Sequence, residues 1–408
     1  MQNFTSLLVY YLIVKEIDWG QYMKVLCLGG SGGMGRYATK AIADFEELEA
    51  ITIADLNKDA AEEFAKSFDA KVQGIGLDVT DTKNLAEALK GHDLVLNTTG
   101  PFFMFGVPIL KAAIENNCHY IDICDDWEPT EEMLKLDSHA KDVGISAIIG
   151  LGASPGITNL MGLVAMEELD SADTVITGWD LSSVNPAEES SQTGTNAAMI
   201  HGIQQMTGKV KIFEDGQLSM VQSLKELKIN YPGKGIYKAN IFGHPEAISF
   251  PYHFPKIKNS FNVAHGSKKI DIFIIKIILW LSEKNIISQD KAANIFHWLE
   301  TQTNRPSFSS KKAGLPAIYG LAHGIKNGSA ASVGVTFSAN NLEKEVSMGE
   351  ATGHPLALGL KLFLQGKINK PGVFAPEGGV IDTQDFFNAY AELEGLEKGL
   401  DISRSWEI

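Results

Sequence analysis

A glycine-rich turn between two apolar segments constrains this chain more than any other feature. The apolar run 25–28 meets the turn GGSGGMG at 29–35, a helix-like stretch follows, and a second apolar run, 50–54, ends at Asp55. The glycines satisfy G-x-G-x-x-G, and the acid lies 20 residues after the last of them. This order of strand, turn, helix, strand and acid predicts a dinucleotide-binding βαβ unit.

Each glycine of the motif has an expected role. Gly30 permits the tight turn out of the strand, Gly32 lets the backbone approach a pyrophosphate, and Gly35 lets the helix pack closely on the strand. The helix N-terminus offers N–H groups and a positive dipole end to the phosphates. The predicted cofactor contacts in this unit are Gly30, Ser31, Gly32, Gly33, Met34, Gly35 and Asp55.

The acid at the end of the second strand bears on the choice of cofactor. Asp55 can accept hydrogen bonds from the adenosine ribose hydroxyls, and its charge would repel a 2′-phosphate. Leu56, the next residue, supplies no cation, although Lys58 lies within reach of such a phosphate. The sequence therefore favours NAD and leaves NADP open.

Strands and helices alternate regularly up to about residue 150. After Asp55, helices are expected at 59–68, 84–89, 107–115 and 129–141, and strands at 71–77, 93–97, 120–123 and 146–149. This alternation predicts an α/β fold with a Rossmann-type, doubly wound parallel sheet. Ligands bind beyond the carboxyl ends of such strands, which selects the turns 29–35, 97–106, 124–127 and 150–159.

The turn after the strand 93–97 is a second expected cofactor contact. Its hydroxyls and backbone can line the nicotinamide ribose, whereas the alternative is an ordinary strand-to-helix loop. The predicted contacts are Asn97, Thr98, Thr99, Gly100 and Pro101. Asp78 either contacts the adenine end, or it or Asp81 caps the helix that follows.

Two further turns carry candidate substrate and catalytic residues. Asp125 and Asp126 are adjacent acids that can share a proton or bind an ammonium group, although a solvated loop is the alternative. The turn 150–159 leads into a helix whose N-terminus can hold a substrate carboxylate. Its candidate contacts are Ser154, Thr158 and Asn159, with helix capping by Ser154 or Thr158 as the alternative.

Composition and charge limit the kinds of partner that the chain is expected to bind. The net charge of −15 disfavours nucleic acid. The three cysteines have neither metal nor disulfide spacing, which suits a reducing cytoplasm and predicts no metal site. The apolar run 7–14 is too short to span a membrane. Residues 1–22 form an extension, either because Met23 is the natural start or because an extra strand or helix precedes the first strand.

The pattern changes after about residue 170. Strands are expected at 174–181, 210–213, 236–242 and 331–337, with helices at 270–282 and 290–301. Asn327-Gly328 is a hairpin signal. Helices return at 355–364 and 383–393. We expect an α+β domain in this second part, which also contains His244, a further candidate site residue.

Several motifs together resemble the saccharopine dehydrogenase family over roughly residues 23–395. The matching pieces are VLCLGG at 25–30, Asn97 with Gly100-Pro101, YID at 120–122, GASPGITN at 152–159, HPE at 244–246, ATGHP at 351–355 and GVFAPE at 372–377. The resemblance implies a dinucleotide domain of residues 23–170 plus 349–395. It also implies an inserted domain at 171–348 that supplies a substrate wall and a homodimer contact.

The resemblance further implies an NAD(P)-dependent oxidoreductase acting on a C–N bond of a small amino-acid-like substrate of the saccharopine, lysine or carboxynorspermidine type. Asp126 and His244 are then the candidate proton shuttles. One alternative is a catalytically inactive dinucleotide-binding sensor or scaffold. Another is an epimerase-like enzyme, which lacks a usable Tyr/Lys pair because Pro255 interrupts the helix that Tyr252 and Lys256 would need.

Overall fold

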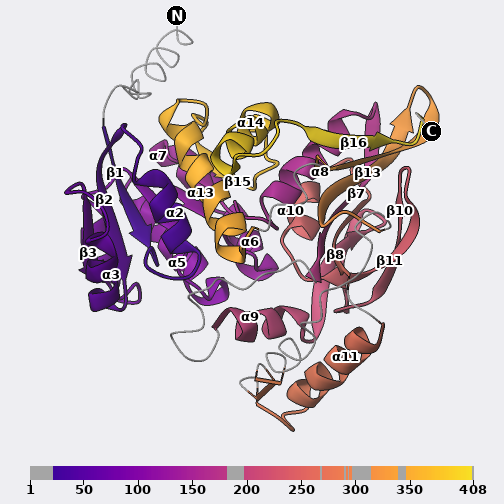
Figure 1. Cartoon of the computed structure of the whole chain (residues 1–408), viewed down its shortest axis with the longest axis horizontal. Coiled ribbons are helices and arrows are strands. Elements are labelled where there is room, and N and C mark those ends of the chain that lie inside the picture. The colour runs from indigo at the N-terminus through magenta and orange to yellow at the C-terminus, as the bar shows by residue number, and fades with distance from the viewer. Residues whose placement is uncertain are drawn as a thin grey trace, which may run out of the picture.

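The computed structural model describes residues 22–181, 197–266, 269–288, 291–292, 294–295, 314–338 and 346–406. The predicted extension at 1–22 and the predicted helix at 290–301 lie almost entirely outside these ranges. The described residues form two sheets with helices packed on them (Figure 1).

The first sheet has seven strands in the order β15-β6-β5-β4-β1-β2-β3, and every described pair is parallel. This is the order of a doubly wound dinucleotide-binding sheet with one added edge strand. The strands are β1 (Met23–Leu28), β2 (Leu48–Asp55), β3 (Val72–Gly76), β4 (Leu94–Asn97), β5 (His119–Asp122), β6 (Ser146–Ile148) and β15 (Gly372–Phe374).

Crossover helices cover this sheet, and the predicted fold class is confirmed. They are α2 (Gly35–Ile42), α3 (Lys58–Ala65), α4 (Thr82–Leu89), α5 (Phe102–Glu115), α6 (Trp127–Leu134) and α7 (Asp137–Val143). The central strands are mostly apolar because helices bury both faces of the sheet there: the side chains of Val25, Ile51 and Val95 have no exposed surface.

The second sheet is mixed and follows the order β10-β11-β12-β7-β13-β14-β16, with the β8–β9 hairpin joined to β12. Its strands are β7 (Ser171–Asp180), β8 (Lys209–Glu214), β9 (Gln217–Gln222), β10 (Glu226–Tyr231), β11 (Gly235–Phe242), β12 (Asn259–His265), β13 (Ile318–Lys326), β14 (Ser329–Phe337) and β16 (Leu400–Arg404). The remaining helices of this part are α9 (Ala197–Met206), α10 (Glu246–His253) and α11 (Lys269–Glu283).

Helix α8 (Ile157–Glu167) joins the two sheets. It begins at the carboxyl edge of the first sheet and then lies on β13 of the second. A Cβ at Gly320 would stand 2.1 Å from the backbone nitrogen of Gly162, so Gly320 must be glycine for this close approach. A Cβ at Gly162 would stand 2.8 Å from the Phe250 ring. The two sheets are therefore held together by a shared, buried helix.

The C-terminal part returns to the first sheet through α13 (Met348–Leu364) and α14 (Thr383–Glu394). Figure 1 shows α13 beside α2. A Cβ at Gly353 would lie 2.7 Å from the Met34 oxygen, and one at Gly349 would lie 2.1 Å from the Tyr37 ring. Strand β16 then pairs with β14 of the second sheet, a pairing that the sequence analysis did not anticipate.

Local structure differs from the sequence predictions at three helices. The predicted helix 129–141 is two helices, α6 and α7. Helix α5 starts at Phe102 and α13 at Met348, so Pro108 and Pro355 lie inside helices that were expected to begin at or near them. Ser347 and Glu350 form a capping box that sets the true start of α13.

Other local predictions agree with the structure. Asn327 and Gly328 both have positive φ in the turn between β13 and β14, as the hairpin signal predicted. Helix α10 ends at His253, before Lys256, so Tyr252 and Lys256 do not share a helix. Within the described ranges, no helix is long and apolar enough to cross a membrane.

Candidate active site

The glycine loop makes its tight turn at Gly29, where φ is +69°. Gly30, to which the turn was assigned from the motif, closes the same turn, since its nitrogen donates to the Cys27 oxygen at 3.2 Å. A Cβ at Gly30 would lie 2.8 Å from the Cys27 Cβ, so the turn requires glycine at this position too. The expected role of Gly35 holds, since a Cβ at this position would stand 2.2 Å from the Gly29 oxygen and 2.6 Å from Thr98 Oγ1.

The other two glycines of the loop face open space. A Cβ at Gly33 would meet no atom within 4 Å, and one at Gly32 would meet only the Gly29 oxygen, at 3.2 Å. No side chain caps α2, and no acidic residue lies in its first turn. Because this leaves an exposed, positively polarised loop beside a helix N-terminus, the residues fit the pyrophosphate of a dinucleotide.

The acid at the end of β2 lies next to this loop. Ser31 Oγ donates a hydrogen bond of 2.6 Å to Asp55 Oδ2, and the Asn57 nitrogen donates to Asp55 Oδ1 at 3.1 Å. The carboxylate is therefore held at the strand end where an adenosine ribose would lie. Leu56 beside it is 76 % exposed.

The turn after β4 is tied to β1. Thr98 Oγ1 donates to the Leu28 oxygen at 2.9 Å, and the Thr99 nitrogen donates to Asn97 Oδ1 at 3.0 Å. Gly100 and Pro101 complete the turn before α5. This places the turn beside the glycine loop, as expected from the positions of β1 and β4 in the sheet.

A buried chain of hydrogen bonds lies beneath this turn. Asn97 Nδ2 donates to Tyr120 Oη at 2.8 Å, and Tyr120 Oη donates to Asp122 Oδ2 at 2.8 Å. Asp122 Oδ1 accepts from the backbone nitrogens of Cys124 and Gly150. Burial raises the pKa of Asp122 to about 6, although these backbone hydrogen bonds act in the opposite direction. Asp122 thus links three of the turns at the carboxyl edge.

The two acids after β3 have different local roles. Asp81 caps α4 by accepting hydrogen bonds from the backbone nitrogens of Lys83 and Asn84, so the capping alternative holds for this residue. Asp78 accepts from the nitrogen and hydroxyl of Thr80 at 2.9 and 2.7 Å. Asp78 lies just after β3, and its contact with the adenine end of a cofactor stays a prediction.

Asp126 is 5 % exposed, and it lies at a pocket of about 270 Å³. Its Oδ2 accepts from the Phe103 nitrogen at 3.2 Å, and Gln205 Nε2 lies 3.4 Å from its Oδ1 and 3.1 Å from the Asp125 oxygen. The pocket is lined by Phe103, Asp126, Trp127, Glu128, Gln204, Gln205, Thr207, Lys209, Val210 and Gly243. It therefore lies between the edge of the first sheet and the second part of the chain.

His244 and the turn 150–159 meet in the structure, although they are about 90 residues apart in sequence. Ser154 Oγ lies 3.3 Å from His244 Nδ1, and it donates to Glu246 Oε1 at 2.7 Å. Thr158 Oγ1 donates to the same carboxylate oxygen at 2.9 Å. The capping alternative for Ser154 and Thr158 was wrong: α8 begins at Ile157 with Gly156 as its N-cap, and no side chain caps it from these two positions.

Thr158 and Asn159 have no exposed surface. Asn159 Oδ1 accepts from the Gly156 nitrogen, and its Nδ2 donates to Glu377 Oε2, both at 2.7 Å. Both side chains are thus hydrogen-bonded within the protein, and their contact with a substrate stays a prediction. Of the three candidates in this turn, Ser154 alone is partly exposed.

Two fully buried carboxyl groups, Glu246 and Glu377, were not among the predicted site residues. Burial raises the pKa of Glu377 to about 7, while the hydrogen bond from Asn159 lowers it. The available signal was that both acids lie in the family motifs HPE and APE. Local pattern did not reveal their roles, because acids in short Pro-containing loops are usually exposed.

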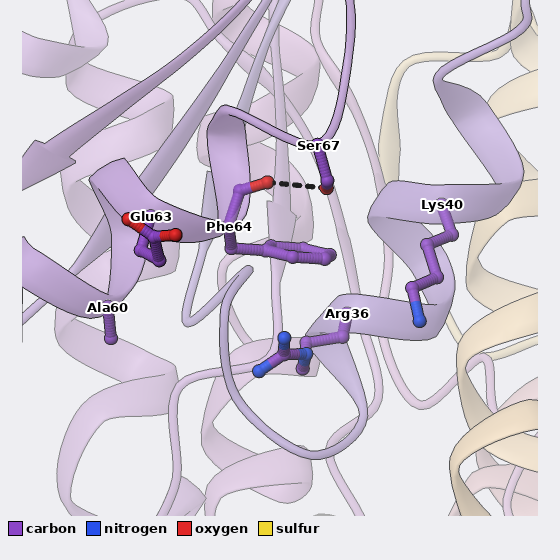
Figure 2. Close-up of a pocket in the computed structure, with 6 residues that line it drawn as sticks. All are labelled: Arg36, Lys40, Ala60, Glu63, Phe64 and Ser67. Atoms are coloured by element: carbon purple, nitrogen blue, oxygen red, sulfur yellow. Dashed lines mark hydrogen bonds between the residues drawn. The ribbon is translucent and has the colours of Figure 1, made fainter.

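A second pocket, of about 360 Å³, lies between α2 and α3. Figure 2 shows the Arg36 guanidinium beneath the Phe64 ring and the Lys40 side chain to the right of that ring. The guanidinium carbon lies 4.4 Å from the centre of that ring. None of the predicted site residues lines this pocket, and we assign it no part in the chemistry. Among the residues described, no cluster of three or more His, Cys, Asp or Glu suits a metal ion.

This chain is similar to known proteins in sequence and in fold. The family model of the saccharopine dehydrogenase NADP binding domain matches residues 25–148. Carboxyaminopropylagmatine dehydrogenase of Synechocystis sp. is 24% identical over 380 residues, which cover 87% of this chain and 92% of that protein. Carboxynorspermidine synthase of Vibrio alginolyticus is 24% identical over 383 residues, which cover 85% and 90%.

Among solved structures, the L-glutamate-forming saccharopine dehydrogenase of Saccharomyces cerevisiae has the same fold. Its TM-score is 0.59 at 17% identity, and the match covers 93% of this chain and 99% of that one. The likeness therefore extends over both sheets.

The fold and the cofactor edge define an oxidoreductase that binds a nicotinamide dinucleotide. More particularly, residues 25–148 match the NADP binding domain of saccharopine dehydrogenase, and the resemblance to that family seen in the sequence is confirmed.

Proposed function

We propose that this protein reduces or oxidises the C–N bond of a carboxylate-bearing secondary amine, of the kind named in carboxynorspermidine and carboxyaminopropylagmatine. The observation that carries the proposal is the pocket at Asp126. In this pocket the buried carboxylate of Asp126, at the carboxyl edge of the first sheet, lies beside polar side chains of the second part of the chain. A bound nicotinamide dinucleotide supplies or accepts the hydride.

The lining of the pocket suits a substrate that has both amine and carboxylate groups. Asp126 and Glu128 provide carboxylates for an ammonium group, and Lys209 provides a cation for a carboxylate. The Phe103 nitrogen and Gln205 hold Asp126 in place, so a proton can move between its carboxyl group and the substrate nitrogen. Asp125, whose oxygen contacts the same glutamine, serves in substrate binding.

The test is turnover by the full-length protein, followed at the nicotinamide absorbance band. NADH or NADPH is offered with carboxylate-bearing aldehydes and a panel of diamines, and NAD or NADP with saccharopine and lysine. We expect Asp126→Asn to lower kcat by at least about 100-fold, the usual contribution of a positioned acid or base. Asp125→Asn, as the neighbouring control, should raise KM instead. Tight NADH binding without any turnover would support the alternative, an inactive sensor or scaffold.

For the cofactor, we propose that Asp55 favours NAD over NADP. Ser31 and the Asn57 nitrogen orient its carboxylate toward the ribose position, where it attracts hydroxyls and repels a phosphate. The description of the matching family model points the other way, toward NADP. Equilibrium binding decides: Asp55→Asn should weaken NADH binding by roughly tenfold and reduce discrimination against NADPH. Equal affinity of the wild-type protein for both cofactors would refute the preference.

We further propose the assembly that the resemblance implies. Residues 23–170 with 349–395 form the dinucleotide domain, and residues 171–348 form the inserted domain, which β16 extends. The inserted domain contacts a second copy, and the buried, unpaired thiols Cys27, Cys118 and Cys124 suit the cytoplasm. Light scattering on the purified chain tests the homodimer, since a monomeric mass at micromolar concentration would exclude it.

A further inference from the structure

Glu246 lies at the start of α10, two residues after His244, and it was not among the expected site residues. It has no exposed surface. Its Oε1 accepts hydrogen bonds from Ser154 Oγ at 2.7 Å, from Thr158 Oγ1 at 2.9 Å and from Asn262 Nδ2 at 2.9 Å. Three donors thus converge on one oxygen of this buried carboxyl group. Glu246 therefore fixes the direction of the hydroxyl groups around it.

The orientation of the Ser154 hydroxyl determines whether its oxygen donates a hydrogen bond to His244 or accepts one from it. A serine hydroxyl has one proton, and Ser154 directs it to Glu246. Ser154 Oγ can then only accept from His244 Nδ1, which lies 3.3 Å away. In a neutral imidazole, a proton on Nδ1 means that Nε2 has none.

The imidazole is also held in orientation. Trp179 stacks on His244 with ring centres 5.8 Å apart and planes 13° apart, and Phe242 packs edge-on at 4.8 Å. Trp179 Nε1 is in turn bonded to Asn262 Oδ1 at 3.2 Å, so the partner of Glu246 also holds the stacking ring. These contacts oppose rotation of the His244 ring.

We propose that Glu246 is a positioning residue that acts through Ser154 to keep the neutral His244 ring in the Nδ1–H tautomer. This tautomer leaves Nε2 as the nitrogen that accepts a proton. The inference rests on the proposed function insofar as His244 exchanges protons with substrate. It concerns a proton position that can be measured without turnover.

The experiment uses long-range ¹H–¹⁵N correlation spectra of the full-length protein with ¹⁵N-labelled histidine, at a pH where His244 is neutral. The wild-type spectrum should show the Nδ1–H pattern for His244, assigned by its loss in His244→Gln. Ser154→Ala and Glu246→Gln should change that pattern to the other tautomer or to a mixture. Ser154→Thr, which keeps a hydroxyl group, should preserve it. Ser249→Ala provides the matched control, because Ser249 lies in the same helix and is 1 % exposed.

Turnover provides the second readout. With saturating cofactor, Ser154→Ala and Glu246→Gln should each lower kcat at least tenfold and leave the affinity for the dinucleotide unchanged, with Ser154→Thr restoring activity. An Nε2–H pattern in the wild-type protein, or an unchanged pattern in both variants, would overturn the inference. The expected pattern in a protein that turns over no substrate would support the tautomer assignment and count against the proposed function alone.

Discussion

The glycine loop and the cluster around Glu246 are both polar regions beside the first sheet, but they are built in opposite ways. The loop is open, since a methyl group at Gly33 would touch nothing in the protein. The cluster is closed: Ser154, Thr158 and Asn262 all direct their donors to one buried carboxylate. The open region can bind a ligand from solution, whereas the closed region orients the few groups at its border.

The largest effect is expected from substitution at Gly35. Gly35→Val places carbon 2.2 Å from the Gly29 oxygen, so the loop and α2 must separate. We expect a loss of about 3 kcal/mol or more in unfolding free energy and no measurable NADH binding. Calorimetry and cofactor titration measure both quantities.

Gly33→Ala is the control that separates folding from binding. It should leave the melting temperature nearly unchanged because its methyl group points into open space. It should still weaken NADH binding about tenfold or more if the pyrophosphate lies on the loop. Unchanged NADH affinity would remove the loop from the cofactor site.

The second largest effect concerns the buried acid Glu377, which should make the free energy of unfolding depend on pH. The pKa of Glu377, about 7, lies above the ordinary value of 4.5 that it regains on unfolding. Its stabilising contribution is therefore complete below pH 4.5 and is lost as the pH rises through 7, by roughly 3 kcal/mol in all. Glu377→Gln should flatten the decline between pH 5 and 8 in chemical denaturation. Parallel curves for variant and wild type would show that the acid does not titrate in this range.

Helix α13 packs against α2, the helix that follows the glycine loop. Gly353→Ala introduces a Cβ 2.7 Å from the Met34 oxygen and should cost about 1–3 kcal/mol. Gly202→Ala, in α9, meets no atom within 4 Å and should be neutral or slightly stabilising. Equal melting temperatures for the two variants would mean that α13 does not pack closely on α2.

The smallest effect is expected at Leu56, which is 76 % exposed. Leu56→Arg should change stability by less than about 0.5 kcal/mol. It should strengthen NADPH binding up to about tenfold by pairing with the 2′-phosphate. A matched Leu56→Gln variant separates charge from size, and equal gains in both would exclude ion pairing as the cause.

Most of the first sheet was predictable because its signals are local. Each strand is a short apolar run beside a turn, and the motif from Gly29 to Asp55 lies within one βαβ unit. Errors occurred where a distant contact overrides local preference, as at Pro108 and Pro355, which lie inside helices. The positive φ of the turn lies at Gly29, beside the predicted Gly30, because the motif fixes the spacing of glycines and not the backbone angle at each.

The sequence by itself determined the class of fold, the glycine loop and the family resemblance, since each depends on contiguous residues whose spacing reflects backbone geometry. Tertiary structure alone decided that Ser154, His244 and Glu246 meet, that Asn159 donates a hydrogen bond to Glu377, and that Gln205 contacts Asp126. These contacts join segments up to 218 residues apart. Their partners are chosen by how the two sheets pack through α8, which no local pattern encodes.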